Sequence, residues 1–333
     1  MNSVARFLIT GIPILILAGC GGGGDGGGAS QTAAVAPADI TSLNAPVIAG
    51  AVMQTALEGG GLGAFAGVGS GSIVQDPNSQ LFATLGEIQK THTESLRQKA
   101  QYGVLQDTIP PQMTDCLNGG TVTVSGEVTN PLTLSPTDSF TLIYTACDDG
   151  AGIMNGTYEM SVTGFSGDLL SGMFVFDVTV TLTAFEITDA GETVTANGSI
   201  SISLDLTASS TMSVTVTSTG LTVAEGGSSH TLGSFSVTQT VDQLTSAYTM
   251  TVSGALTSSA FTGRVTFSTS IALQSDGLGY AFTGEVTIAG ADSASITVIV
   301  IDDVLVRLEI DLDGVNGPDE IVDTTWAELL AQT

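Results

Sequence analysis

From Gly120 onward the chain alternates apolar residues with small polar ones, and this alternation has a period of two. Segments 121–124, 200–204 and 212–216 show it most clearly, and they are rich in the β-branched residues that strands favour. A period of two places every second side chain on the same face of a strand, so one face can be buried and the other solvated. The sequence therefore predicts an all-β body.

Turn-forming residues divide this body into about twelve strands, many of them longer than is usual. Asn-Gly and Asp-Gly favour hairpins because both residues tolerate positive φ. Consecutive hairpins predict a long antiparallel meander that forms a twisted sheet, a sandwich or a partly closed barrel. The predicted turns are Asn130-Pro131, Asp148-Asp149-Gly150, Asn155-Gly156, Asp189-Ala190-Gly191, Asn197-Gly198, Glu225-Gly226-Gly227 and Ser275-Asp276-Gly277.

One or two helices are expected ahead of the strands. Residues 41–57 have a helical composition, and the glycines that follow would end such a helix. Asp76 can cap a second helix, over about 77–101, with Pro77 in its first turn. Its apolar stripe recurs at three- and four-residue steps and consists of Leu81, Leu85, Ile88, His92 and Leu96. We therefore expect an amphipathic helical region over 76–103 and a β domain over 104–333.

The first residues are typical of a secretory signal, with Arg6 before an apolar run over 7–17 that is too short to span a bilayer. The run ends in Leu17-Ala18-Gly19-Cys20, which resembles the lipobox of bacterial lipoproteins. The resemblance implies that diacylglycerol is attached to Cys20, that residues 1–19 are removed and that the new N-terminus is acylated. The alternative is an ordinary secretory signal that contains a cysteine by chance.

Residues 20–75 are rich in Gly and Ala and are expected to form a lipid-anchored tether. Seven of the eight residues 21–28 are glycine. In enterobacterial-type lipoproteins an Asp directly after the lipidated cysteine favours retention in the inner membrane, whereas Gly21 occupies that position here. The resemblance therefore implies attachment to the outer membrane.

The charge of the chain is strongly negative, with 33 acidic residues against six Lys and Arg. From Cys116 onward there are 25 acidic and two basic residues, which gives this part a net charge of −23. Such a body repels phosphate backbones and anionic lipid head groups. The composition therefore argues against nucleic acid as a partner, and it favours a well-solvated surface.

Three cysteines remain to be assigned. If Cys20 is lipidated, Cys116 and Cys147 are left as one pair in an oxidising compartment, and a disulfide is expected. Closing a loop of about thirty residues would remove chain entropy worth about 3.6 kcal/mol from the unfolded state. The alternative, a reactive thiol pair, lacks both the CxxC spacing and a nearby histidine.

The sequence offers no constellation of residues that is typical of an enzyme. The two histidines, His92 and His230, are far apart and do not stand in a zinc-binding spacing. The segment Gly164-Phe165-Ser166-Gly167-Asp168 lacks the closing glycine of a nucleophile elbow. We therefore predict a non-enzymatic protein with no catalytic residues.

One acidic segment has the ligand chemistry of a calcium site. Asp311, Asp313, Asn316 and Asp319 offer oxygen atoms at short spacing, and the segment begins like an EF-hand loop. It departs from that pattern because Val315 and Val322 stand at the fifth and twelfth positions. Two interpretations remain open, a turn that binds calcium and an ordinary acidic hairpin.

Two stretches resemble a group of proteobacterial outer-membrane lipoproteins that have no assigned chemistry. They are Cys116-Leu117-Asn118-Gly119-Gly120 with the later Cys147, and the C-terminal segment 324–329 that contains Trp326. The resemblance implies that Trp326 lies in a C-terminal strand.

The function expected from these features is that of a lipoprotein with a structural or binding role in the cell envelope, in contact with the membrane through its N-terminal lipid. The alternative is a carrier of lipid or of another hydrophobic ligand, because long strands occur together with an amphipathic helix and a high apolar fraction. An envelope protein or a hydrophobic molecule is then the expected partner.

Overall fold

The computed structural model describes residues 35–61, 108–129, 135–148, 150, 152–168, 173–189, 191–208, 210–225, 227–277 and 279–332. The chain divides into two compact units, Met1–Ala34 and Val35–Thr333. The described residues all belong to the second unit. Our predictions for the signal peptide, Cys20 and the helix over 77–101 lie outside the described residues.

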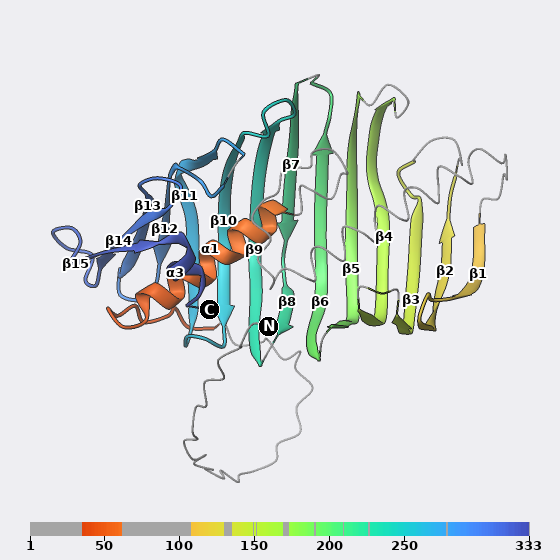
Figure 1. Ribbon diagram of the computed structural model, residues 1–333, viewed down its shortest axis with the longest axis horizontal. Coiled ribbons are helices and arrows are strands. Elements are labelled where there is room, and N and C mark those ends of the chain that lie inside the picture. Colours follow the sequence, from red (N-terminus) through yellow and green to blue (C-terminus); the bar gives the residue numbers. More distant parts are fainter. Residues whose placement is uncertain are drawn as a thin grey trace, which may run out of the picture. The chain divides into compact units, whose positions relative to one another are not determined.

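The second unit is built on one antiparallel sheet, which confirms the predicted all-β body (Figure 1). The sheet has fifteen strands where the turn signals suggested about twelve. The strands are β1 (Thr108–Asp115), β2 (Gly119–Glu127), β3 (Ser139–Asp148), β4 (Ile153–Asp168), β5 (Met173–Asp189), β6 (Glu192–Asp205), β7 (Thr211–Ser218), β8 (Leu221–Glu225), β9 (Ser228–Asp242), β10 (Tyr248–Ser258), β11 (Arg264–Ser275), β12 (Thr283–Ala289), β13 (Ser295–Val300), β14 (Leu305–Asp311) and β15 (Glu320–Thr325).

The strands follow one another in the sheet in nearly the same order as in the sequence. The exception is β8, which pairs with β6 and β9 and lies off the main path. Because β7 pairs with residues 200–205 of β6 and β8 pairs with residues 194–197, the two short strands together fill one position between β6 and β9. The meander of hairpins is therefore continuous from β1 to β15.

The turns predicted at Asn155-Gly156 and Asn197-Gly198 were wrong, because both dipeptides lie inside strands, in β4 and β6. Each asparagine faces an irregularity in the preceding strand. The Asn155 side chain accepts a hydrogen bond of 2.8 Å from the backbone N–H of Ala146, and Asn197 accepts one of 2.7 Å from Ala184. The two alanines have positive φ of 46° and 45°, and the register shifts at both positions. The asparagines thus bind N–H groups that the bulges take out of the ladder.

Two glycines leave room for the bulged alanines on the other side of each bulge. A Cβ atom on Gly156 would lie 2.1 Å from the carbonyl oxygen of Ala184, and Gly156 itself has a φ of +97°. Gly120 has the same relation to Ala146, with a distance of 1.8 Å. The bulges in β3 and β5 are therefore matched by a glycine in the strand on one side and an asparagine in the strand on the other.

The apolar side chains of the sheet form one continuous face. Cross-strand partners show this, since residues directly opposite each other in a sheet lie on the same face. One row of successive partners runs from β4 to β10, and all its members are buried: Val162, Val178, Ile202, Val216, Val237 and Val252. The alternation seen in the sequence therefore places the core of this unit on one side of the sheet.

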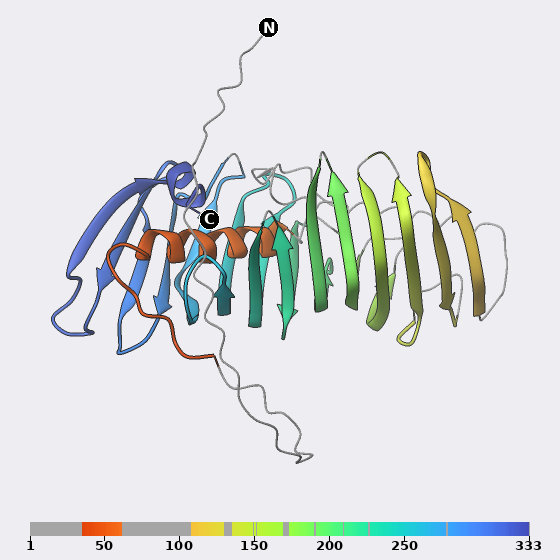
Figure 2. The same cartoon turned by 90° about the horizontal axis from the view of Figure 1, so that it is seen from below.

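Helix α1 (Ala45–Gly61) packs against the C-terminal part of the sheet and contacts β9, β10, β13 and β14. Figures 1 and 2 show it lying across these strands, with the short helix α3 (Trp326–Leu330) beside it. Its buried side chains are Ala45, Ile48, Ala49, Ala51, Val52, Met53 and Ala56. The helix predicted over 41–57 is therefore present, and part of the segment assigned to the tether contributes to the core.

The Trp-containing segment was expected as a strand, but Trp326 opens helix α3 directly after β15. The cause is a capping box, in which Thr325 Oγ1 accepts a hydrogen bond from Glu328 N while the Glu328 carboxylate accepts one from Thr325 N. The Trp326 ring is buried and stacks on Tyr280, with 5.3 Å between the ring centroids. Its Nε1 donates to the Ala281 carbonyl at 3.3 Å.

The predicted disulfide is present between Cys116 and Cys147, which lie 5.4 Å apart at their Cα atoms. It joins the turn between β1 and β2 to the end of β3. Asn118 strengthens the same corner, because its backbone N–H donates to the Asp148 carbonyl and its side chain donates to the Asp148 carboxylate. The bond therefore stabilises the edge of the sheet that is formed by the first three strands.

Candidate functional site

The residue expected to carry the lipid, Cys20, belongs to the first unit and lies outside the described residues. The described chain begins at Val35, and Pro37 forms an isolated bridge with Arg264 at the start of β11. Among the residues that the structure describes, no helix has both the length and the apolar character needed to cross a bilayer.

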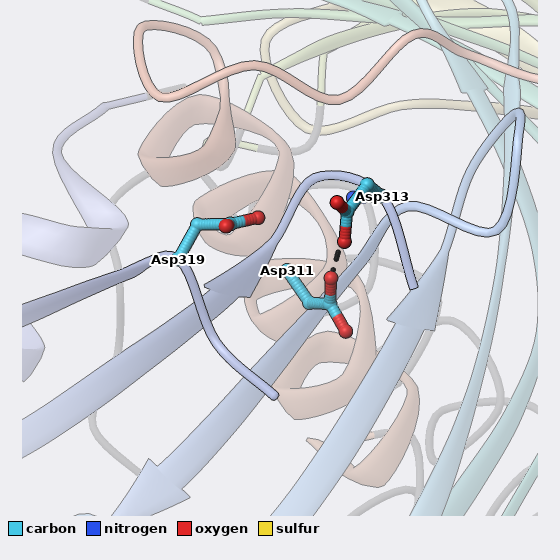
Figure 3. Close-up of side chains that lie close together, drawn as sticks. All are labelled: Asp311, Asp313 and Asp319. Carbon is cyan, nitrogen blue, oxygen red and sulfur yellow. Dashed lines mark hydrogen bonds between the residues drawn. The ribbon is translucent and has the colours of Figure 1, made fainter. Parts of the chain in front are cut away.

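The acidic segment forms the turn between β14 and β15 (Figure 3). Asp311 is the last residue of β14, and Asp313 and Asp319 lie in the turn that follows. One oxygen of each of these three carboxylates lies within 4.8 Å of the others. Asn316, the fourth predicted ligand, is exposed in the same turn and has a positive φ of 70°.

The three carboxylates also organise the backbone of the turn. Asp311 Oδ1 accepts hydrogen bonds from the N–H groups of Asp313 and Gly314, at 3.2 and 2.7 Å. Asp313 Oδ1 accepts one from Val315 N, and Asp319 Oδ2 accepts one from Leu312 N, both at 2.8 Å. The contacts of Asp311 and Asp313 are local turns of the Asx type, and the contact of Asp319 closes the loop across seven residues, so these bonds hold the loop whether or not a cation is present.

The geometry of this turn is compatible with both interpretations of the sequence. A hard cation such as calcium takes six to eight oxygen ligands, and the turn offers three carboxylates, an amide and solvent. On the other hand, exposed carboxylates that bind backbone N–H groups are common in acidic hairpins without an ion. Calcium at Asp311, Asp313, Asn316 and Asp319 therefore stays a prediction.

The opposite face of the sheet is lined by hydroxyl groups. Pairs of Ser and Thr side chains on neighbouring strands lie within hydrogen-bond distance, between 2.9 and 3.2 Å, and either oxygen can be the donor. Each such pair contributes roughly 0.2–1 kcal/mol. The pairs are Thr179–Ser201, Thr181–Ser199, Thr188–Thr193, Thr215–Thr238 and Thr222–Thr231.

The two histidines are not brought together within the described residues, since His92 lies outside them. His230 lies near the start of β9, opposite Val223 of β8 and Ser258 of β10. Its side chain is half-buried, and its Nδ1 has no hydrogen-bond partner among the described residues. Burial lowers the pKa of the His230 imidazole. Folding therefore favours the neutral form of this imidazole.

The basic side chain of Arg307 on β14 is paired with Asp323 on β15. Arg307 Nε donates to Asp323 Oδ1 at 2.8 Å, and Nη2 donates to Oδ2 at 3.1 Å. The bidentate pair lowers the pKa of the Asp323 carboxyl and raises the pKa of the guanidinium. Arg307 is thus engaged in an ion pair across β14 and β15.

No protein-family model, no curated protein and no solved structure matches this chain. The resemblance to outer-membrane lipoproteins therefore stays a prediction that depends on the quoted motifs. Our expectation that Asn155-Gly156 and Asn197-Gly198 form turns missed the bulges in β3 and β5. The available signal was the alternating pattern, which continues on both sides of each dipeptide as it does along a strand.

Proposed function

We propose that this chain is a lipoprotein that holds a large β-sheet body at the outer membrane, with a non-enzymatic structural or binding role in the cell envelope. The observation that carries the proposal is Leu17-Ala18-Gly19-Cys20 directly behind an apolar run. The disulfide between Cys116 and Cys147 supports it, because such bonds persist in oxidising compartments.

The spacing between the anchor and the body limits where the protein acts. Fourteen residues separate Cys20 from Val35, where the second compact unit begins. A fully extended chain of that length reaches at most about 50 Å. That length sets an upper limit for the distance between Cys20 and Val35, and the negative charge of the body discourages close contact with anionic head groups.

Growth with labelled palmitate tests the anchor. The wild-type chain should incorporate the label, and Cys20→Ala should abolish incorporation, because the cysteine thiol supplies the site of attachment. Cys116→Ser/Cys147→Ser is the matched control, since it removes thiols elsewhere and should keep the label. Label retained in Cys20→Ala would contradict the proposal.

Membrane fractionation tests the outer-membrane assignment. Wild-type protein should separate with the outer membrane, whereas Gly21→Asp should shift it to the inner membrane. Gly24→Asp adds the same charge farther from the cysteine and should leave the distribution unchanged. An unchanged distribution for Gly21→Asp would contradict the proposed sorting but would leave the lipid anchor intact.

The alternative function, a carrier of lipid or of another hydrophobic ligand, is favoured by the apolar face of the sheet. That face continues beyond the strands that α1 contacts, and on β4 it includes the buried hydroxyl of Tyr158. Native mass spectrometry of the protein should detect a co-purifying hydrophobic molecule if the chain is such a carrier. Protein that is free of bound lipid and does not bind a hydrophobic dye would exclude this alternative.

A further inference from the structure

The apolar face of β3 to β6 is buried, although the described strands form a single layer. A single-layer sheet leaves both faces open to water unless another element covers one of them. Yet five apolar side chains near the centre of this face are each at most 2% exposed. These side chains are Phe140, Tyr158, Val180, Leu182 and Phe185.

The described helices pack elsewhere on the same face. The principal contacts of α1 with the sheet are with β9, β10, β13 and β14, and those of α3 are with β15. The face of β3 to β6 lies farther along the sheet toward β1 (Figure 1). The Tyr158 hydroxyl is buried there and has no hydrogen-bond partner among the described residues, and burial raises the pKa of its phenol.

We propose that residues 77–101 of this chain pack as an amphipathic helix against the apolar face of β3 to β6. The apolar stripe of this segment, Leu81 to Leu96, would lie against the sheet, and its charged side would face water. The inference is independent of the lipid anchor, because it concerns only the core of the second unit.

The ends of the connecting chain support this placement. Residues 62–107 join the end of α1, which lies toward β9 in Figures 1 and 2, to the start of β1 at the far edge of the sheet. Seven strand positions separate β9 from β1, which corresponds to about 34 Å at the usual strand spacing. A helix over 77–101 would be about 37 Å long, so it fits the distance that the chain must cross.

Charge complementarity supports the same placement. The segment 77–101 carries Lys90, Arg97 and Lys99, which are three of the six basic residues of the chain, against two acidic residues. The sheet domain from Cys116 onward has a net charge of −23. A weakly basic helix on an acidic sheet lowers the repulsion within the compact unit, which favours this segment over a second copy of the acidic body.

Photo-cross-linking in cells tests the contact directly. A photoreactive amino acid at position 88, in the apolar stripe, should link to peptides from β3 to β6 of the same chain. The same amino acid at position 83, on the opposite side of the helix, is the matched control and should give at most a tenth of that yield. Links from position 88 to lipid, to a second copy or to no part of β3–β6 would overturn the proposal.

Thermal stability gives a second readout that does not depend on cross-linking. Leu85→Asp places a charge against the apolar face, and the temperature at which the full-length protein becomes protease-sensitive should fall by roughly 5–10 °C. Ala83→Asp introduces the same charge on the solvated side and should change that temperature by less than about 2 °C. Equal shifts in the two variants would overturn the proposal, whether or not Cys20 carries lipid.

Discussion

The C-terminal and the N-terminal parts of the sheet differ in the length of their strands and in the regularity of their backbone. Strands β12 to β15 are short, with six or seven residues each, and their side of the sheet is packed against α1 and α3. Strands β4 to β6 have 14 to 17 residues, and bulges interrupt β5 and the nearby β3. The C-terminal strands are thus short and regular, and the longest strands are found where the backbone is interrupted.

The difference has a physical reason. Twist accumulates along a strand, so a long regular strand loses register with its neighbours and fits poorly to a second layer. A bulge divides such a strand and changes its direction locally, at the cost of an N–H group that leaves the ladder. Asn155 and Asn197 bind those groups in the N-terminal part. In the C-terminal part, the packing around the buried side chain of Trp326 supplies the stabilising contacts.

The largest expected effect is on the helical end of the sheet. Trp326→Ala removes a side chain that is 1% exposed and stacks on Tyr280, so the free energy of unfolding should fall by about 3–5 kcal/mol. Hydrogen exchange should accelerate first in β13 to β15 and in α1, and later in β4 to β6.

Trp326→Phe is the control for this prediction. It keeps an aromatic ring beside Tyr280 but removes the hydrogen bond to Ala281, so it should cost less than half as much as the alanine variant. If Trp326→Ala accelerated exchange equally in β4 to β6 and β13 to β15, the two ends would be one cooperative unit, and the contrast between them would fail.

The bulge in β5 predicts a smaller loss of stability in the N-terminal part of the sheet. Gly156→Ala would bring a Cβ atom to 2.1 Å from the Ala184 carbonyl oxygen, and it also places alanine at a φ of +97°. The backbone must shift, and the free energy of unfolding should fall by about 2–3 kcal/mol in a denaturant titration.

Gly191→Ala separates the free-energy cost of the steric clash from the cost of the positive φ. Gly191 has nearly the same φ, +90°, but no atom lies within 4 Å of the position of its Cβ. This variant should therefore show the cost of the backbone strain alone, about 1 kcal/mol. A cost at Gly156 no larger than the cost at Gly191 would mean that the bulge in β5 moves freely to accept a side chain.

His230 on β9 predicts that the stability of the fold depends on pH. Burial lowers the pKa of His230, so the folded state prefers the neutral imidazole, whereas the unfolded chain binds a proton below a pH of about 6.5. Stability is therefore fully present above that pH and declines as the pH falls below it. Between pH 7.5 and 5.5 the unfolding midpoint should decrease slightly, by an amount that partial exposure of the ring keeps small.

The test variant is His230→Gln. It should flatten the profile in this pH range, because the group with the lowered pKa is gone. The window avoids the pH range in which the carboxyl groups with lowered pKa values, such as Asp242 and Asp323, titrate. A profile that keeps its slope in His230→Gln would show that the pH dependence belongs to another group.

The alternating pattern was enough to predict the strands and their apolar face, and the turn signals between them predicted the antiparallel order. The disulfide followed from the number of cysteines once Cys20 had been assigned. The alternation on both sides of Asn155-Gly156 and Asn197-Gly198 indicated strands at these positions, but the dipeptides were assigned to turns because Asn-Gly has the same conformational preferences in a hairpin as opposite a bulge. The helix at Trp326 was missed because its capping box depends on only two side chains, Thr325 and Glu328.

The smallest expected effect concerns the acidic turn at the helical end of the sheet. If Asp311, Asp313, Asn316 and Asp319 share a cation, calcium should raise the melting temperature by mass action, and magnesium, which demands tighter octahedral geometry, should do less. The hydrogen bonds that the three carboxylates accept from the turn already hold it without an ion. We therefore expect equal and small shifts from calcium and magnesium, of the kind that a body with a net charge of −23 gives with any divalent salt.

Asp311→Asn/Asp313→Asn should leave those shifts unchanged. A larger shift with calcium that disappears in the double variant would establish a metal site at this turn, and the bound ion would then stabilise the C-terminal part of the sheet.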